Sequence, residues 1–136
     1  MSDINTILGE IKTLISANGL TVVYEFNSLP IIREKGEVVG VIGIKAMNSK
    51  SAYPLAGKIS SSFELTFRLN LIAEEGTPVT SLYNALEESV LNALIASSYN
   101  ILEISAEPAR TDFKLQKLVL PAEFKLLCEE SQELII

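Results

Sequence analysis

Residues 63–71 alternate strictly between apolar and polar side chains. Phe or Leu occupies every second position, and the residues between them are polar: Glu64, Thr66, Arg68 and Asn70. Because successive side chains of a strand point to opposite faces of a sheet, this pattern predicts a strand with one buried and one polar face. The polar face poses the main functional question, since it can look toward water, a substrate or another copy of the chain.

Two other segments repeat their apolar residues at the three-and-four spacing of an amphipathic helix. The first covers residues 3–17 and ends before Asn18-Gly19, a pair that favours the left-handed conformation of a helix stop. The second begins at Thr77-Pro78, interpreted as an N-cap and the first helical residue, and reaches about Ser98. Its apolar stripe consists of Val79, Leu82, Tyr83, Leu86, Val90, Leu94 and Ile95.

Further segments are predicted strands because they are rich in β-branched and aromatic residues or alternate in polarity. They cover residues 20–26, 38–47, 101–107 and a last strand that begins at Phe113. Gly40 and Gly43 are interpreted as bulges or places where another part of the chain approaches closely. Turns are expected at residues 34–37 and 109–112. Beyond Pro121 the pattern leaves the course of the chain open: residues 124–128 are a candidate extension of the sheet, and residues 129–136 either fray or dock on a neighbour.

A long exposed loop is predicted at residues 48–58, NSKSAYPLAGK, because Ser, Asn, Pro and Gly break every periodicity there. Its Tyr53-Pro54-Leu55 cluster is a candidate contact point, although Tyr53 folding back on its own loop is an equal alternative. The aromatic residues on apolar faces are expected in the core: Tyr24, Phe26, Phe63, Phe67, Tyr83 and Phe113.

The order of the predicted elements is helix, strand, strand, long loop, strand, long helix, strand, strand. Short connections make neighbouring strands antiparallel, and each helix has a single apolar stripe to bury. We therefore predict an α+β fold, a mainly antiparallel sheet of about five strands with two helices packed on one face. Without a repeat, linker or low-complexity segment, residues 1–136 are expected to form a single domain.

The charge balance narrows the function. A net charge of −6, from 11 basic and 17 acidic residues, argues against a surface that binds nucleic-acid duplexes. The loose basic group Arg110, Lys114 and Lys117 is interpreted as a solvated strand edge or loop. No apolar run approaches the roughly eighteen residues of a membrane span, and residues 1–8 show no signal-peptide pattern. We expect no membrane association, with the cytoplasm as the default location.

Residues for catalysis or metal binding are scarce. The chain has no His and a single Cys, Cys128, which excludes an intrachain disulfide and the usual zinc, copper and iron ligand sets. Apolar and acidic neighbours in LLCEE are expected to raise the pKa of the Cys128 thiol, so it is not an activated nucleophile. Phosphate-binding glycine motifs are absent, and adjacent carboxylates such as Glu87-Glu88 point in different directions. We expect no enzyme activity, cofactor or metal.

The element order resembles that of the tail terminator (tail completion) proteins of long-tailed bacteriophages and contractile tail-like particles. The similarity lies in the short helix ending at ANG, the NSKSAYPLAGK loop, the strand SSFELTFRLNLIA, the helix GTPVTSLYNALEESVLNALI and the closing strand pair from Ile101. It spans nearly the whole chain and consists of sizes and periodicities rather than of particular residues.

The resemblance implies a structural protein that caps the tail tube as a ring, probably a hexamer, ends tube polymerisation and forms the head-joining surface. Its implied partners are other copies of itself, the tail tube protein and the head–tail connector protein. No membrane or specific nucleic acid is implied, and DNA passes through the ring. The implied location is the bacterial host cytoplasm during assembly and then the tail of the virion or tail-like particle.

On this reading, the polar face of residues 63–71 looks toward a neighbouring subunit or the central channel. The candidate contact residues are then Tyr53, Pro54, Leu55, Glu64 and Arg68. Residue chemistry alone favours plain solvent exposure of Glu64 and Arg68. The alternative function is a small ligand-binding or regulatory domain of ferredoxin-like type that dimerises through its sheet. Oligomeric state distinguishes the two, since the first requires a ring and the second a dimer.

Overall fold

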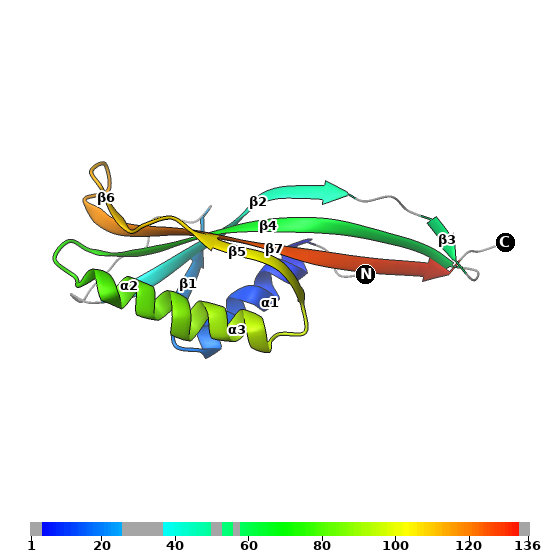
Figure 1. Cartoon of the computed structure of the whole chain (residues 1–136), viewed down its shortest axis with the longest axis horizontal. Coiled ribbons are helices and arrows are strands. Elements are labelled where there is room, and N and C mark those ends of the chain that lie inside the picture. Colours follow the sequence, from blue (N-terminus) through cyan, green and yellow to red (C-terminus); the bar gives the residue numbers. More distant parts are fainter. Residues whose placement is uncertain (1–3, 26–36, 50–52, 56–57, 134–136) are drawn as a thin grey trace.

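The computed structural model describes residues 4–25, 37–49, 53–55 and 58–133 (Figure 1), with the backbone alone for 49, 53–55, 58–62 and 129–133. The fold is α+β, with two helices on one face of a mixed, mostly antiparallel sheet. This confirms the fold class predicted from the sequence.

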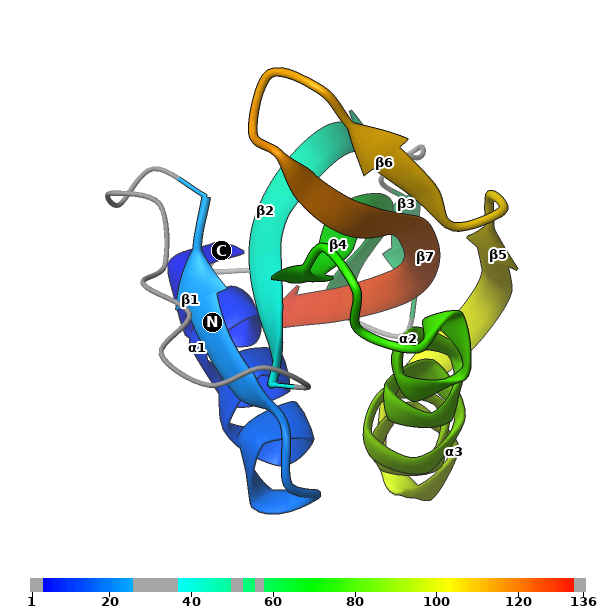
Figure 2. The same ribbon diagram turned by 90° about the vertical axis from the view of Figure 1, so that its left-hand side faces the viewer.

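The two helices lie next to each other beneath the sheet (Figure 2). The first, α1, spans Ile4–Ala17 and stops at Gly19, whose φ of 98° suits glycine. The second consists of α2 (Val79–Ala85), η1 (Leu86–Leu91) and α3 (Asn92–Ala96), joined without a break because the junction residues keep helical backbone angles. The η1 segment is π-helical, so its turns contain more residues than those of an α-helix.

The strands form one twisted sheet in the order β1-β2-β4-β7-β5, with β3 added to β4 and β6 to β7. β1 runs parallel to β2, and every other pairing is antiparallel. The bounds are β1 Thr21–Tyr24, β2 Val38–Ser49, β3 Tyr53–Leu55, β4 Lys58–Glu74, β5 Asn100–Ala106, β6 Arg110–Asp112 and β7 Lys117–Glu133.

The core lies between the helices and the apolar face of the sheet. In β4 the alternation predicted from the sequence is confirmed, since Leu65, Phe67, Leu69 and Leu71 are fully buried. Phe67 stacks on Phe124 of β7 with ring centroids 5.1 Å apart. The helices add Ile7, Leu8, Ile11, Ile15, Leu82, Val90, Ala93 and Leu94 to the same cluster. Each fully buried large side chain contributes about 1.5–3 kcal/mol relative to exposure, so this interface dominates stability.

The longest pairing joins β4 and β7 from Lys58↔Glu133 to Glu74↔Lys117. The possibility that residues 124–128 extend the sheet is confirmed, because β7 continues through Pro121 to Glu133. The Pro121 carbonyl accepts a hydrogen bond from the Glu107 N–H in the connection between β5 and β6. The nitrogen of Pro121 lies on that same side, where the neighbouring strand is itself broken. The missing N–H donor therefore leaves no gap in the β4–β7 pairing.

Other local expectations are corrected by the structure. Residues 48–58 are not one long loop, because β2 runs to Ser49, β3 pairs with Ser60, Ile59 and Lys58, and β4 begins at Lys58. The turn of the last hairpin lies at residues 113–116, while 110–112 form β6. Phe26 lies outside the described residues, and of the turn expected at 34–37 only residue 37 is described.

The start of the second helix also differs from the prediction. Pro78 is its N-cap and Thr77 makes no capping hydrogen bond. The Thr77 hydroxyl is instead buried, without a hydrogen-bond partner in the described part of the chain. Gly76, with a φ of 86°, turns the chain sharply before the helix, which removes Thr77 from the cap position.

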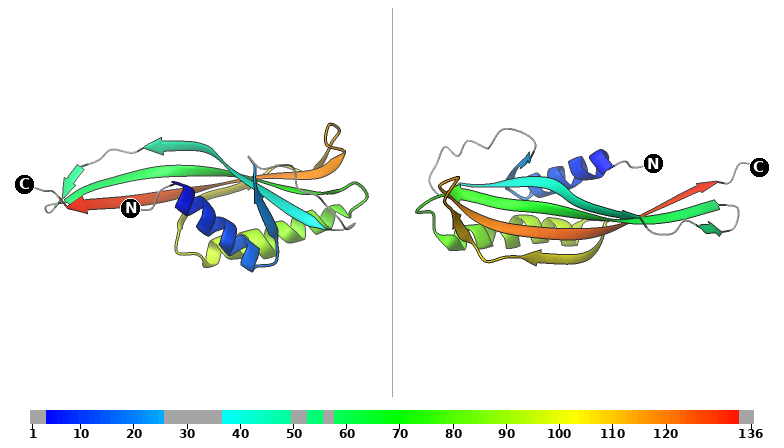
Figure 3. Two further views of the ribbon diagram at one scale, coloured as in Figure 1. Left: turned by 180° about the vertical axis from the view of Figure 1, so that it is seen from behind. Right: turned by 90° about the horizontal axis from the view of Figure 1, so that it is seen from above.

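One end of the sheet extends beyond the helices as an arm (Figures 1 and 3). We define the arm as residues 47–49 of β2, β3, residues 58–64 of β4 and residues 127–133 of β7. Helices cover the neighbouring part of β4, where Leu65 is fully buried, while Phe63 is only half-buried. Met47, opposite Leu65, is 49 % exposed. The apolar face of the core thus continues onto an uncovered surface.

Candidate functional site

The polar face of the sheet, opposite the helices, carries a row of paired charges. Arg68 lies between Gly43 of β2 and Glu123 of β7 in the register. Its guanidinium donates to both carboxylate oxygens of Glu25 at 3.1 Å. The Glu25 carboxylate lies over Gly43, where an added Cβ would overlap it. Gly43 is therefore a place of close approach, as predicted, and it makes room for the Glu25–Arg68 pair.

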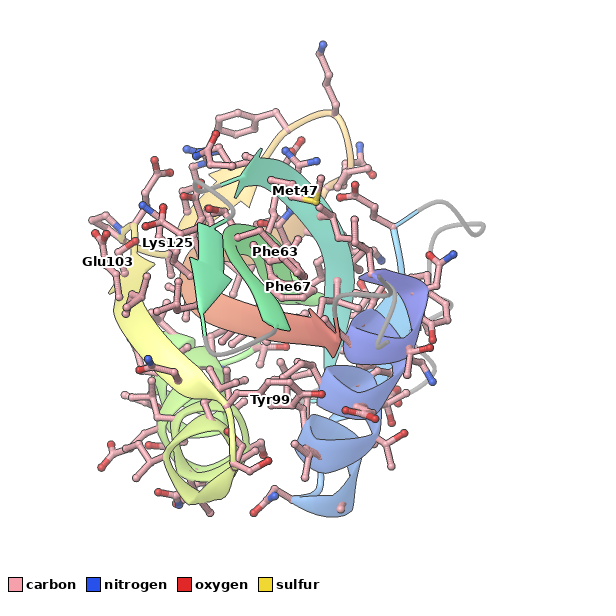
Figure 4. The ribbon with its side chains drawn as sticks, turned by 90° about the vertical axis from the view of Figure 1, so that its right-hand side faces the viewer. Met47, Phe63, Phe67, Tyr99, Glu103 and Lys125 are labelled. Atoms are coloured by element: carbon pink, nitrogen blue, oxygen red, sulfur yellow. The ribbon has the colours of Figure 1, made fainter. Side chains whose placement is uncertain are left out.

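A second pair links strands that are far apart in the sequence. Lys45 stands at the irregularity between Ile44 and Ala46, and its ammonium donates to Glu123 Oε1 at 2.6 Å. Beyond it, Glu103 of β5 and Lys125 of β7 lie directly opposite each other (Figure 4). The side chains of the Glu25–Arg68 and Lys45–Glu123 pairs are about one-third exposed or more, so each of these two pairs contributes at most about 1 kcal/mol to stability.

Lys45, Arg68 and Glu123 border an open hollow of about 570 Å³ on the polar face. Arg68, Asn70 and Ile72 of β4 line it, and the β5–β6 connection and the β6–β7 hairpin line it from the side. Its charges balance, with Lys45, Arg68 and Arg110 against Glu107, Asp112 and Glu123. Most of these charges are already paired within the chain.

Two observations concern metal and thiol chemistry in the described residues. No group of three or more His, Cys, Asp and Glu side chains is placed to hold a metal ion in that part of the chain. Burial raises the pKa of the Cys128 thiol, as the sequence predicts. Cys128 lies opposite Phe63 at the start of the arm, half-buried and without a neighbouring base among these residues. It is a poor nucleophile at neutral pH.

The predicted contact residues are spread over the arm and the polar face. Tyr53, Pro54 and Leu55 form β3 near the arm tip, and the structure describes only their backbone. Glu64 is half-buried between Asn48 and Leu127. Arg68 lies farther inward and is held by Glu25. The structure therefore separates Arg68 from the arm residues, and the five do not form one cluster.

Exposed apolar residues are the feature that sequence reasoning missed. Phe113, expected in the core, is 86 % exposed because it lies in the hairpin turn rather than in a strand. Ile95 is 75 % exposed because the wide π-helical turns before it rotate it away from the buried stripe. Tyr83, also expected in the core, is 41 % exposed, and its hydroxyl accepts a hydrogen bond from the Ala109 N–H at 3.0 Å.

Comparisons with known proteins do not identify the chain. No protein-family model matches the sequence, and no curated protein is significantly similar to it. One solved structure, whose name describes no function, aligns over 96 % of this chain and 90 % of its own, with 13 % identity and a TM-score of 0.47. A likeness at this level carries no argument about function. Within the described residues, no helix is long and apolar enough to cross a membrane.

Proposed function

We propose that this chain is a structural tail protein of the tail terminator type, which assembles into a ring on a tail tube and ends its growth. The arm is the observation that carries the proposal. It is a long projection of paired strands that extends beyond the helices and adds little to the core of its own chain.

Ordering such an arm needs a compensating gain. Fixing each residue costs roughly 1–2 kcal/mol of backbone entropy, which is normally offset by apolar burial. In the arm, the described apolar side chains are only partly covered, with Met47 49 % exposed and Phe63, Leu127 and Cys128 half-buried. Contact with another subunit would supply the missing burial.

The arm also presents open strand edges. Beyond Ile42, where β1 and Glu25 end their contact with β2, residues 43–49 have no strand neighbour except β4 among the described residues. Residues 128–133 of β7 pair only with β4 within the same part of the chain. Unpaired edges of this kind accept strands from other chains, which suits assembly through the arm.

Electron microscopy of tail tubes mixed with the purified protein tests the proposal. We expect a single ring at one end of each tube and an arrest of tube growth. Met47→Glu, on the exposed apolar face of the arm, should weaken capping without changing the melting temperature. Ser16→Glu introduces the same charge at an exposed position of α1 and should leave capping unchanged.

The hollow on the polar face favours a second candidate, the ligand-binding or regulatory domain that dimerises through its sheet. If tubes grow unchanged at saturating protein and no ring is seen at their ends, the terminator proposal fails. A stable dimer at micromolar concentration, with a melting temperature raised by a small charged ligand, would then favour this second candidate.

A further inference from the structure

The β6–β7 hairpin presents an aromatic side chain on a fixed turn. Asp112 Oδ1 accepts hydrogen bonds from the backbone N–H groups of Lys114 and Leu115 at 3.0 and 3.1 Å. The Gln116 N–H donates to the Asp112 carbonyl at 2.7 Å, and Gln116 takes a left-handed φ of 55°. These bonds hold Phe113, 86 % exposed, and Lys114 at the end of the hairpin. A large apolar group held outward in this way suits recognition, because little entropy is lost when it binds.

The hairpin is basic although the chain is acidic. Arg110, Lys114 and Lys117 stand against the single acidic residue Asp112, in a chain of net charge −6. Lys117 is paired with Glu74 and Arg110 with Glu107. Lys114 has no ion pair with any described residue, so its charge is available to an acidic partner.

The second helix carries a complementary surface, the helix row, defined as Val79, Tyr83, Glu87, Leu91 and Ile95. These residues recur at every fourth position, and the wide turns of η1 keep them on one side of the helix. Val79, Tyr83 and Ile95 are 45, 41 and 75 % exposed. Leu91 is half-buried and Glu87 is exposed. The helix row is thus an apolar strip with one carboxylate in its middle.

A chain cannot make this contact with itself. The hairpin turn projects from the sheet on the side opposite the helices (Figures 1 and 2). The hydrogen bond from Ala109 to Tyr83 also ties the base of the hairpin beside the helix, which leaves its tip pointing away. Contact between the tip and the helix row therefore requires a second copy.

We infer that the hairpin tip of one copy docks on the helix row of the next. Phe113 packs between the apolar members of the row, and the Lys114 ammonium pairs with the Glu87 carboxylate. The contact is head-to-tail, so successive copies close into a ring if the rotation between them allows it. The inference deepens the proposed function by naming the contact between neighbours in the ring.

The size of the contact predicts its strength. One aromatic side chain buries about 150–250 Å², far below the roughly 1,600 Å² of a standard stable interface. A single tip contact is therefore weak. Isolated copies separate in dilute solution, and the ring persists where further contacts, such as those of the arm, add to this one.

Site-directed cross-linking tests the inference without any tail component. In a Cys128→Ser background, Lys114→Cys and Glu87→Cys proteins are mixed at millimolar concentration and treated with a short bismaleimide. We expect a cross-linked pair at several times the yield obtained when Lys114→Cys is mixed with the control Ser16→Cys, which places the thiol on the exposed side of α1. Equal yields, or no cross-link at all, would overturn the inference.

A charge exchange between Lys114 and Glu87 supplies a second test. Lys114→Glu and Glu87→Lys should each reduce self-association in sedimentation equilibrium, and the double variant should restore it. Unchanged melting temperatures show that each variant is folded. If rings form on tubes but neither assay shows the predicted pairing, the contact is refuted while the proposed function stands. If the pairing is seen and tubes are never capped, the contact stands and the proposed function fails.

Discussion

At the scale of single residues, Thr77 shows how a local motif and its surroundings can disagree. Thr before Pro at the start of an apolar stripe is typical of an N-cap. Thr77 is nevertheless only 3 % exposed, and its hydroxyl makes no capping hydrogen bond. A buried hydroxyl without a partner costs about 1–3 kcal/mol relative to a satisfied one. Thr77 is therefore a point of local instability rather than a stabilising cap.

Replacing Thr77 with Val should stabilise the protein. Val keeps the shape of Thr and removes the buried hydroxyl, so we expect the melting temperature to rise by a few degrees, given that about 1 kcal/mol moves it by several degrees in a domain of this size. Thr80→Val, one turn along at an exposed site, is the matched control and should change little. A fall of several degrees in the Thr77 variant would mean that the residue caps the helix after all.

Cys128 gives a pH-dependent prediction. Burial raises the pKa of its thiol in the folded state above the value in the unfolded chain, which is about 8.5. The folded state therefore holds the thiol proton more tightly than the unfolded chain does. The free energy of unfolding thus keeps its full value below about pH 8.5 and falls as the pH rises above it. We expect Cys128 to react with iodoacetamide more slowly than a free thiol at pH 8, with its rate rising at higher pH. Reaction at the rate of an unfolded peptide would contradict the burial.

At the scale of elements, strands with a long regular pattern could be predicted and interrupted ones could not. The alternation from Phe63 to Leu71 locates β4 because burial on one face fixes its register. The sequence left the course of β7 beyond Pro121 open, since whether a missing N–H matters depends on the neighbouring strand. Phe113 misled the prediction, because an apolar residue in a turn has the same sequence signature as one in a strand.

The polar pairs of the candidate site could not be predicted for a related reason. Arg68 and Glu25 are 43 residues apart, and Lys45 and Glu123 are 78 residues apart. Their contact depends on the order of the strands in the sheet and on the bulge at Lys45. The polarity pattern of one strand predicts neither. The lack of His and of a second Cys, by contrast, could be read directly from the sequence.

The rate of amide hydrogen exchange should differ between two parts of β4. Amides at residues 68–71 lie over the helix-covered core, whereas those at 60–63 lie in the arm, where fewer apolar contacts oppose local opening. We expect exchange in the arm to be roughly tenfold faster or more in the isolated protein. Peptide-level mass spectrometry measures this, with the unfolded chain as the reference rate. Equal protection of both segments would show that the arm is stable without a partner.

At the scale of the whole molecule, stability should not depend on metal or redox conditions. The chain contains no His and a single Cys, and its stability is expected to come from the shared apolar interface of helices and sheet. Thermal melts with EDTA, with reductant and with neither should coincide. A fall of several degrees with EDTA would reveal a bound ion, because loss of a ligand that binds only the folded state lowers its stability.

The central place of β7 in the sheet has a consequence for folding during synthesis. β7 joins β5 to β4, although it follows both in the sequence, and its pairing with β4 connects residues as far apart as Lys58 and Glu133. A nascent chain cannot complete this sheet until its final strand has left the ribosome. Pairings between such distant residues also slow the search for the native state, toward the millisecond-to-second range of sheet-rich domains. Until β7 has been made, the edge of β4 that it will occupy stays open, and an open strand edge of this kind is prone to pair with other chains.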